Sequence, residues 1–158
     1  MILNNLANYV ADIMAFDETK VIIGRENAIR YNFSQNYIVI DTLAPAANLS
    51  NGRDYNYTTE KEKLNTVQKG SFTLEFYGTA AYSNCNKFVN LQSSQQGKDL
   101  QKTYGITCYK ASTINNLKQL AGNKYFDRYE IEVMVLYNDS FEIDTLRIEE
   151  IPTMYVTD

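Results

Sequence analysis

The spacing of apolar positions divides the chain into helical and extended segments. Residues 2–16 repeat apolar side chains three and four positions apart, which predicts an amphipathic helix packed against the rest of the protein. The apolar side of this helix holds Ile2, Leu6, Tyr9, Val10, Ile13 and Met14, and its polar side holds Asn4, Asn5, Asn8, Ala11 and Asp12. A short strand is predicted at residues 20–23, ending at Gly24. The continuous apolar run at residues 37–41 predicts an interior strand.

The segment after this strand is expected to contain a break and then a polar, extended arm. Pro45 and the triplet Ser50-Asn51-Gly52 are turn formers and predict that the strand pattern is interrupted there. From residue 54 to residue 67 the extended pattern places polar side chains on both faces, so this stretch cannot be entirely core. Two interpretations remain open with equal weight: a solvated hairpin, or an arm that reaches a neighbouring subunit.

A strand, a lone glycine and a helix follow between residues 71 and 97. Apolar Phe72, Leu74 and Phe76 alternate with more polar residues, and burying each apolar side chain contributes about 1.5–3 kcal/mol. Thr79 is expected to cap the helix that begins after Gly78. The buried stripe of that helix is Ala81, Cys85 and Phe88, with Tyr82 and Val89 beside it. The helix is expected to end near Gly97, with one or two further turns at residues 98–105.

The last third of the chain is predicted to be mostly extended. A short strand is expected at residues 105–109, and residues 110–126 are ambiguous between loop, strand and helical turn. Odd positions from Tyr129 to Tyr137 form an apolar strand face, Asn138-Asp139-Ser140 is expected to turn the chain, and residues 141–151 are expected to return as a partner strand. The order of elements predicts one α+β domain over residues 1–158, in which an N-terminal and a central helix pack on one face of a mainly antiparallel, twisted sheet.

The residue types argue against catalysis. The chain contains no histidine, so neither a Ser-His nor a Cys-His nucleophile pair can be built, and the usual nitrogen ligand of zinc is missing. Gly78 stands alone, without a phosphate-binding glycine motif around it. Paired acids such as Glu130 and Glu132 fit a charged strand face. We therefore expect no enzyme activity, no metal and no cofactor, and the strand–glycine–helix element is interpreted as architecture.

Charge and hydropathy narrow the possible partners. The net charge of −4 leaves too few bases to displace counterions from nucleic acid, so tight DNA binding is not expected. No apolar run is long enough to span a membrane, and the N-terminus lacks a basic secretory region, so the chain is expected to stay in the cytoplasm unless something carries it out. Cys85 and Cys108 are interpreted as small buried apolar side chains, with a disulfide as the lesser alternative.

Three segments together resemble the neck and tail terminator proteins of tailed phages. Residues 21–41 resemble the first signature of that family: Gly24, Arg25 and Asn27 match, whereas Glu26 replaces a glutamine and Arg30-Tyr31 stands where the family has loop prolines. Residues 70–81 are similar to its central strand, which ends in Tyr-Gly before a helix. Residues 125–138 are similar to its late strand, where an Asp-Arg pair precedes alternating apolar positions. The terminal residues 148–151 are also similar.

The resemblance implies a tail-terminator-like fold and a structural role in the virion. Members of the family form a ring, usually six-fold, at the neck or the head-proximal end of the tail. The implied partners are other copies of the chain, the tail tube protein and the head connector or adaptor. DNA passes through the lumen without specific binding, and assembly takes place in the host cytoplasm. The alternatives are another head-completion or minor tail protein, or a small monomeric module that binds peptides.

The candidate contact residues lie mainly in the polar arm at residues 53–63. Tyrosine and arginine carry interface energy more often than other residue types, so Arg53, Tyr55 and Tyr57 are the expected anchors, with Lys61 and Lys63 beside them. The alternative for the tyrosines is that they lie flat on a solvated hairpin. Arg128 is a further candidate for the subunit interface, although a plain surface charge on a strand is the favoured interpretation for it.

Overall fold

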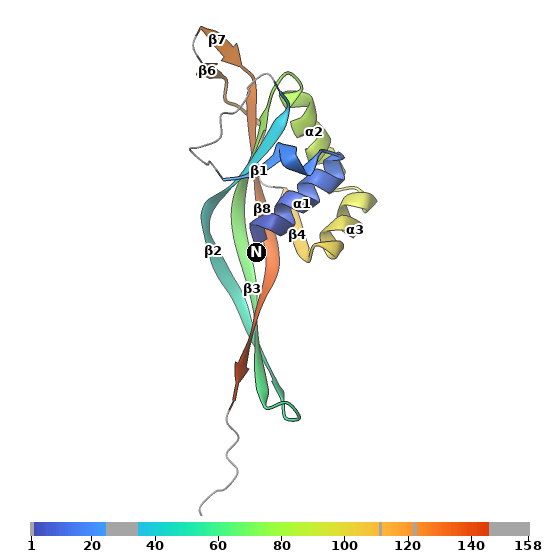
Figure 1. Cartoon of the computed structure of the whole chain (residues 1–158), viewed down its shortest axis with the longest axis vertical. Helices are drawn as coiled ribbons and strands as arrows, with labels where there is room; N and C mark the ends of the chain where they lie inside the picture. Colours follow the sequence, from blue (N-terminus) through green and yellow to red (C-terminus); the bar gives the residue numbers. More distant parts are fainter. Residues whose placement is uncertain (1, 25–34, 111, 122, 146–158) are drawn as a thin grey trace, which may run out of the picture.

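Three α-helices cover one side of a long, twisted sheet in the computed structural model, which describes residues 2–24, 35–110, 112–121 and 123–145 (Figure 1). The helices are α1 (Ile2–Met14), α2 (Ala81–Gln92) and α3 (Gln95–Thr103), and a 3-10 turn, η1, spans Glu18–Lys20. The strands are β1 (Val21–Ile23), β2 (Tyr37–Asn56), β3 (Lys61–Tyr77), β4 (Ile106–Lys110), β5 (Asn115–Asn116), β6 (Gln119–Ala121), β7 (Lys124–Phe126) and β8 (Arg128–Asp144). The predicted α+β class is confirmed.

The main sheet has the strand order β1-β2-β3-β8-β4, with β5 also paired to β8. Only the β1–β2 pair is parallel, and the other pairs in this sheet are antiparallel. The register of β3 against β8 is unbroken from Lys61 opposite Asp144 to Tyr77 opposite Arg128. Alternate side chains of β3 and of β8 therefore point to the same face of the sheet along the whole length of each strand.

The hydrophobic core lies between the helices and the upper part of the sheet. Alternate positions of the central strands supply Phe72, Leu74 and Phe76 from β3 and Ile131 and Val133 from β8, all buried as their alternation predicts. The apolar face of α1 and the predicted stripe of α2, including Cys85, pack onto them. Ala11, assigned to the polar side of the first helix, is in fact buried.

The connection into the helices differs from its prediction at both ends. Thr79 is exposed and does not cap α2; instead the side-chain oxygen of Asn36 accepts a hydrogen bond of 3.0 Å from the backbone N–H of Ala80. The prediction that Gly97 ends the helix is also wrong. Helix α2 ends at Gln92, and Gly97 lies in the first turn of α3, where its N–H donates to the capping hydroxyl of Ser94.

Two predicted interruptions of the sheet are also wrong. β2 continues through Pro45 and Gly52, with irregular pairing between Thr42 and Ser50 in place of a break. β8 continues through Asn138-Asp139-Ser140, because each of these residues is paired with a residue of β3. In both places a neighbouring strand supplies backbone hydrogen bonds that outweigh the local preference for a turn. The family-like residues Arg25, Glu26, Asn27, Arg30 and Tyr31 lie outside the described residues, as do residues 146–151.

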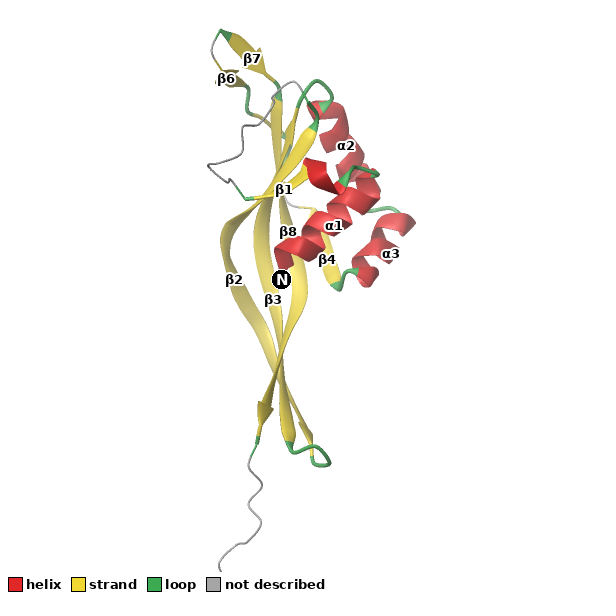
Figure 2. Ribbon diagram, in the orientation of Figure 1, coloured by secondary structure: helices red, strands yellow, loops and turns green. Residues whose placement is uncertain are grey.

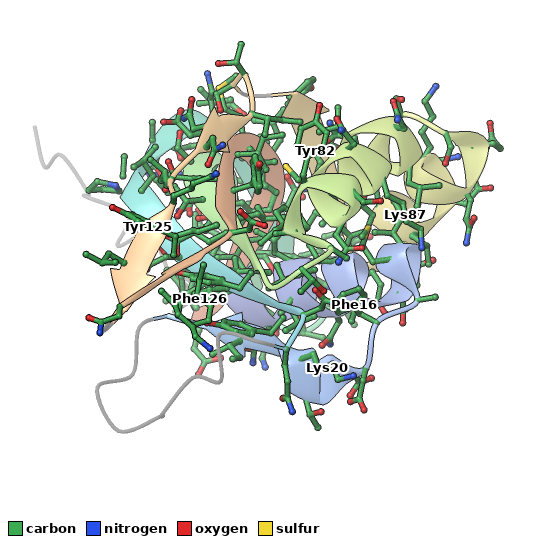
Figure 3. The ribbon with its side chains drawn as sticks, turned by 90° about the horizontal axis from the view of Figure 1, so that it is seen from above. Phe16, Lys20, Tyr82, Lys87, Tyr125 and Phe126 are labelled. Atoms are coloured by element: carbon green, nitrogen blue, oxygen red, sulfur yellow. The ribbon has the colours of Figure 1, made fainter. Side chains whose placement is uncertain are left out.

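The ambiguous segment at residues 110–126 forms short strands. β6 and β7 make a separate two-stranded sheet in which Leu120 lies opposite Tyr125. Seen from above, Tyr125 lies on the far side of the sheet from the helix that carries Lys87 (Figure 3). Tyr125 is 72% exposed, so this hairpin presents apolar surface at the end of the sheet opposite to the tip formed by β2, β3 and β8.

Candidate interaction surface

β2, β3 and β8 extend well beyond the helices as a narrow three-stranded ribbon (Figure 2). We define the ribbon as residues 50–56 of β2, 61–67 of β3 and 138–144 of β8. Three residues, one from each strand, form each row across it: Arg53, Leu64 and Phe141 make one such row. A turn at residues 57–60 joins β2 to β3, and the N–H of Thr145 donates to the carbonyl oxygen of Glu60, which fastens the end of β8 to the turn.

The two faces of the ribbon differ in polarity. On one face of the ribbon lie the alternate side chains of β3 and β8 that continue the core-facing side of the upper sheet. In the ribbon no helix covers this face. This apolar face carries Asn51, Arg53, Tyr55, Glu62, Leu64, Thr66, Asp139, Phe141 and Ile143. Phe141 and Ile143 are 58% and 47% exposed, although aromatic and β-branched residues at these positions suit a covered surface.

The opposite, polar face carries charged and small side chains. Its members are Ser50, Gly52, Asp54, Asn56, Lys61, Lys63, Asn65, Val67, Asn138, Ser140, Glu142 and Asp144. Asn65 donates to Asp54 at 3.0 Å, and Lys61 lies 3.8 Å from Glu142. Both pairs are exposed to solvent, so each contributes at most about 1 kcal/mol to folding stability.

Five of the six candidate contact residues meet at the tip of the ribbon. Tyr57 is 79% exposed and Tyr55 is 49% exposed, so neither belongs to the core. The side chain of Arg53 is 78% exposed, and its Nε lies 3.7 Å from a carboxylate oxygen of Glu62. Lys61 and Lys63 are exposed on the other face, where they line a shallow hollow of about 440 Å³ together with Asp54 and Glu142. These five side chains are available for contact with another molecule.

The outer edges of the ribbon are unpaired within the described part of the chain. β1 pairs with β2 only as far as Ile40, and β4 pairs with β8 only as far as Tyr137. Between Thr42 and Ser50 the edge of β2 is disrupted by register shifts and by Pro45, features that protect an edge from further pairing. From Ser50 to Asn56 the pairing with β3 is regular, and β8 is regular throughout. The ribbon thus presents two regular strand edges.

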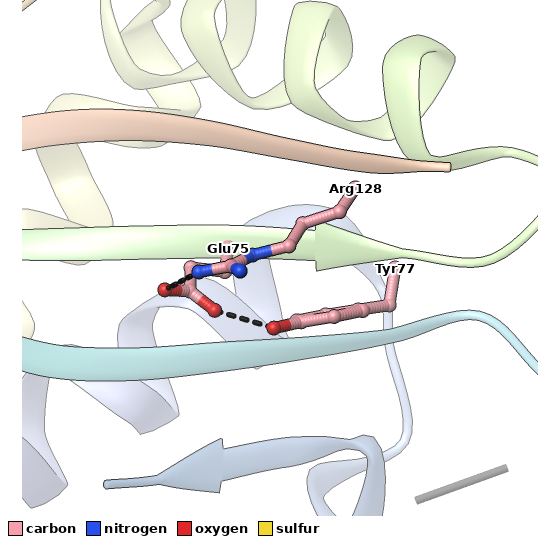
Figure 4. Close-up of polar contacts among 3 residues, drawn as sticks. All are labelled: Glu75, Tyr77 and Arg128. Carbon is pink, nitrogen blue, oxygen red and sulfur yellow. Dashed lines mark hydrogen bonds and ion pairs between the residues drawn. The ribbon is translucent and has the colours of Figure 1, made fainter. Parts of the chain in front are cut away.

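Arg128, the sixth candidate, lies at the far end of β8 from the ribbon tip. Its Nη2 is 2.7 Å from a carboxylate oxygen of Glu75, and the other oxygen of Glu75 accepts a hydrogen bond of 2.5 Å from the hydroxyl of Tyr77 (Figure 4). Glu75 is 1% exposed and Arg128 is 19% exposed. The interpretation of Arg128 as a surface charge is therefore wrong, because its guanidinium neutralises a buried carboxylate.

Neither cysteine thiol has the lowered pKa of a reactive cysteine. Cys85 and Cys108 are free, and burial raises the pKa of Cys85 to about 11 and that of Cys108 to about 12. Both are therefore protonated and weakly reactive near neutral pH. Within the described residues no cluster of three or more side chains has the composition to hold a metal ion. No helix in the described ranges is long and apolar enough to cross a membrane.

Sequence reasoning missed the contribution of β8 to the ribbon. Phe141 and Ile143 continue the odd-numbered apolar positions that start at Tyr129, with Asp139 as the exception. That period of two was a signal for one long strand, and the Asn-Asp-Ser triplet obscured it. The polar arm is a projecting hairpin extended by a third strand, and this shape fits both a solvated hairpin and an arm that reaches a neighbouring subunit.

The fold and this surface define an α+β protein whose most prominent exposed feature is a strand ribbon suited to contact with other proteins. A family model described as phage neck terminator protein matches residues 2–158, and the chain belongs to that family. None of the curated proteins compared with the chain matches it. It is therefore a structural protein of the phage neck or tail, and its place is in that part of the virion.

Proposed function

We propose that this protein forms a closed ring, with six copies as the expected number, at the head-proximal end of the phage tail. The ring terminates the tail tube and joins it to the head connector. Its partners are other copies of the chain, the tube protein and the connector or adaptor protein. Subunits assemble in the host cytoplasm. The observation that carries the proposal is the family match over nearly the whole chain.

The shape of the subunit supports a ring. A ring requires a heterologous contact, in which one surface of a subunit meets a different surface of the next, and the rotation between them closes. The ribbon offers two different edges on opposite sides, which is the arrangement that a heterologous contact needs. An apolar face that continues from the core and is exposed in the single chain also fits burial on assembly.

The charge of the polar face is compatible with passage of DNA. The helices occupy the apolar side of the sheet, so the polar face of the ribbon is the one that fits toward a narrow lumen. The charged residues on that face are Asp54, Lys61, Lys63, Glu142 and Asp144, three acids and two bases. A surface without excess positive charge lets a polyanion slide past without being held.

Native mass spectrometry across a concentration series, with negative-stain images of the same samples, tests the ring. The expected result is a closed species of about six copies, the number that the resemblance implied. If the purified chain stays monomeric, purified tail tubes of the same phage are added, and the expected result is a cap at one end of each tube. A chain that neither closes into rings nor caps tubes would contradict the proposal.

Substitution of Tyr55 and Tyr57 by alanine tests the role of the ribbon tip. Because both side chains are about half exposed or more, their loss should leave the melting temperature nearly unchanged while ring formation weakens. Tyr125→Ala is the matched control, since Tyr125 lies at the other end of the molecule and its exposure of 72% falls between those of Tyr55 and Tyr57. A large fall in melting temperature together with normal ring formation would mean that Tyr55 and Tyr57 stabilise the ribbon and take no part in assembly.

The alternatives differ in what they bind. Another head-completion or minor tail protein would associate with a connector component and leave tail tubes uncapped. A small peptide-binding module would stay monomeric with and without tubes, and its exposed edges would accept a peptide strand. The tube-capping experiment separates these alternatives from a terminator.

A further inference from the structure

We infer that neighbouring subunits pair through the two ribbon edges, with residues 50–56 of one copy lying alongside residues 138–144 of the next as parallel strands. This inference rests on the proposed ring and specifies the contact within it. The two edges are seven residues long, lie at the same height of the ribbon and are both regular. Within the described part of the chain no strand covers either of them.

Symmetry determines the direction of this pairing. β2 and β8 are both antiparallel to β3, so they run in the same direction within one subunit. Rotation about a ring axis that lies along the ribbon preserves this direction, so β8 of one copy meets β2 of the next as a parallel neighbour. Contact of an edge with its own copy would instead be antiparallel and would follow a two-fold axis.

The side chains of the two edges favour one register. When residue 53 lies opposite residue 139, the apolar face places Arg53 beside Asp139 and Tyr55 beside Phe141. Asp139 has no ion pair among the described residues, and Arg53 reaches only the partly exposed Glu62, at 3.7 Å. An unlike pair and an aromatic pair at adjacent strand positions each add to sheet stability.

Registers reached by shifting β8 in one direction are less favourable on the polar face, and a shift by two residues in the other direction removes Arg53 from Asp139. Moving β8 along by two residues in one direction places Asp54 beside Glu142, and moving it by four places Asp54 beside Asp144. Both arrangements set like charges side by side, which is destabilising. A shift by an odd number of residues would place the apolar face of one ribbon beside the polar face of the next. In the proposed register Asp54 lies beside Ser140.

A stagger between subunits is also what a closed sheet requires. In a closed sheet the strands tilt relative to the axis, and the register advances from one strand to the next around the ring. The proposed register is offset by two residues from the level rows of a single ribbon, in which Gly52 and Ser140 share a row. The edge pairing and closure of the ring are thus compatible.

Engineered cysteines on the polar face read out both the pairing and its register. Adjacent strands lie about 4.8 Å apart, within disulfide range, whereas an added shift of two residues separates the Cα atoms by roughly 8 Å. Ser140→Cys is combined in turn with Asp54→Cys, Gly52→Cys and Asn56→Cys. Two strand spacings separate each pair within one chain, so an internal disulfide is excluded and only links between chains form.

The expected result is a ladder of covalent multimers from the Asp54→Cys/Ser140→Cys protein after mild oxidation of assembled rings. The other two combinations should give much less product, and the single variants should stop at dimers. The native thiols contribute little background, because burial raises the pKa of Cys85 to about 11 and that of Cys108 to about 12. Circular dichroism of each variant before oxidation verifies that these exposed substitutions leave the fold intact.

The second measurement follows ring formation after the charges at Arg53 and Asp139 are reversed. Arg53→Glu should place two acids side by side and raise the concentration needed for half-maximal ring formation several-fold. The double variant Arg53→Glu/Asp139→Lys restores an unlike pair and should return this concentration close to that of the parent. Failure of the double variant to recover would contradict the proposed register.

The outcomes separate this inference from the ring proposal. Rings without a ladder from any cysteine pair would overturn the edge pairing and leave the ring intact. A ladder from either of the other two combinations would overturn the register. Links to the tube protein in place of a ladder would show that the edges receive the tube and would overturn pairing between copies. Absence of both rings and tube caps would overturn the proposed function itself.

Discussion

At the scale of single residues, the polar cluster around Glu75 ties three strands together on the sheet face away from the helices. Arg128 comes from β8, and its guanidinium carbon lies 5.7 Å from the ring centre of Tyr77 in β3. Tyr77 stacks on Tyr37 of β2 with ring centres 4.6 Å apart. Burial, and then the hydrogen bond to Glu75, raise the pKa of Tyr77. A carboxylate with 1% exposure requires such a partner because its desolvation is costly.

Removing the positive partner of this cluster should be strongly destabilising. Arg128→Met leaves the buried charge of Glu75 without its cation, and we expect a loss of about 3–5 kcal/mol in the free energy of unfolding, measured by urea denaturation. The double variant Glu75→Gln/Arg128→Met removes both charges and should recover most of this loss. Lys118→Met, at an exposed position, controls for the change in net charge. Equal losses from the single and double variants would show that the ion pair is not the cause.

At the scale of elements, the α2–α3 junction depends on a close approach that only glycine allows. A Cβ atom at Gly97 would lie 2.3 Å from the carbonyl oxygen of Leu91 and 2.9 Å from that of Gln92. Both obstacles are backbone atoms at the end of α2, so neither can move aside alone. Gly97 therefore fixes how tightly α3 folds back onto α2. The helix pair in turn covers the core side of β3, β4 and β8.

Gly97→Ala is expected to destabilise the protein. Forcing a methyl group against fixed backbone should cost about 1–3 kcal/mol and lower the melting temperature in a thermal unfolding experiment. Gly52→Ala is the matched control, because a Cβ there meets only Asn65, at 3.7 Å or more. Its effect should stay within about 0.5 kcal/mol. Comparable losses for the two variants would mean that the close contact at the helix junction is not what limits substitution.

At the scale of the whole molecule, apolar surface is exposed at both ends of a long body. The ribbon carries Phe141 and Ile143 at one end, and the β6–β7 hairpin carries Leu120 and Tyr125 at the other. Under the proposed function, these two surfaces are the candidates for contact with the tail and with a head component. Because the net charge is −4, the protein repels the phosphate backbone of nucleic acid. These exposed apolar surfaces therefore favour contacts with protein over contacts with nucleic acid.

We expect the protein to bind duplex DNA more weakly than DNA-binding proteins bind their non-specific sites. With labelled 30-base-pair DNA in about 150 mM salt, fluorescence anisotropy should show a Kd weaker than roughly 10⁻⁴ M, because few phosphate counterions can be released. A variant with Asp54, Glu142 and Asp144 changed to lysine serves as the control and should bind measurably. Micromolar binding by the parent chain, falling steeply with salt, would contradict a role in which DNA passes freely.

Periodicity alone determined much of the upper part of the molecule. The apolar spacing of α1, the alternation at Phe72, Leu74 and Phe76, and the stripe with Cys85 each identified an element and its buried side. These predictions succeeded because a half-buried helix or strand must repeat its apolar residues at the period of its own geometry. The absence of histidine likewise limited the chemistry before any fold was known.

Only the tertiary structure decided where the strands end and which residue pairs with Arg128. Pro45 and Asn138-Asp139-Ser140 carry the local signals of turns, yet each lies within a strand, because β3 lies alongside and satisfies the neighbouring backbone groups. The pairing of Arg128 with Glu75 joins residues 53 positions apart, which no local pattern could reveal. Local sequence thus determined which residues are buried near the helices, whereas strand pairing at long range created the ribbon and its free edges.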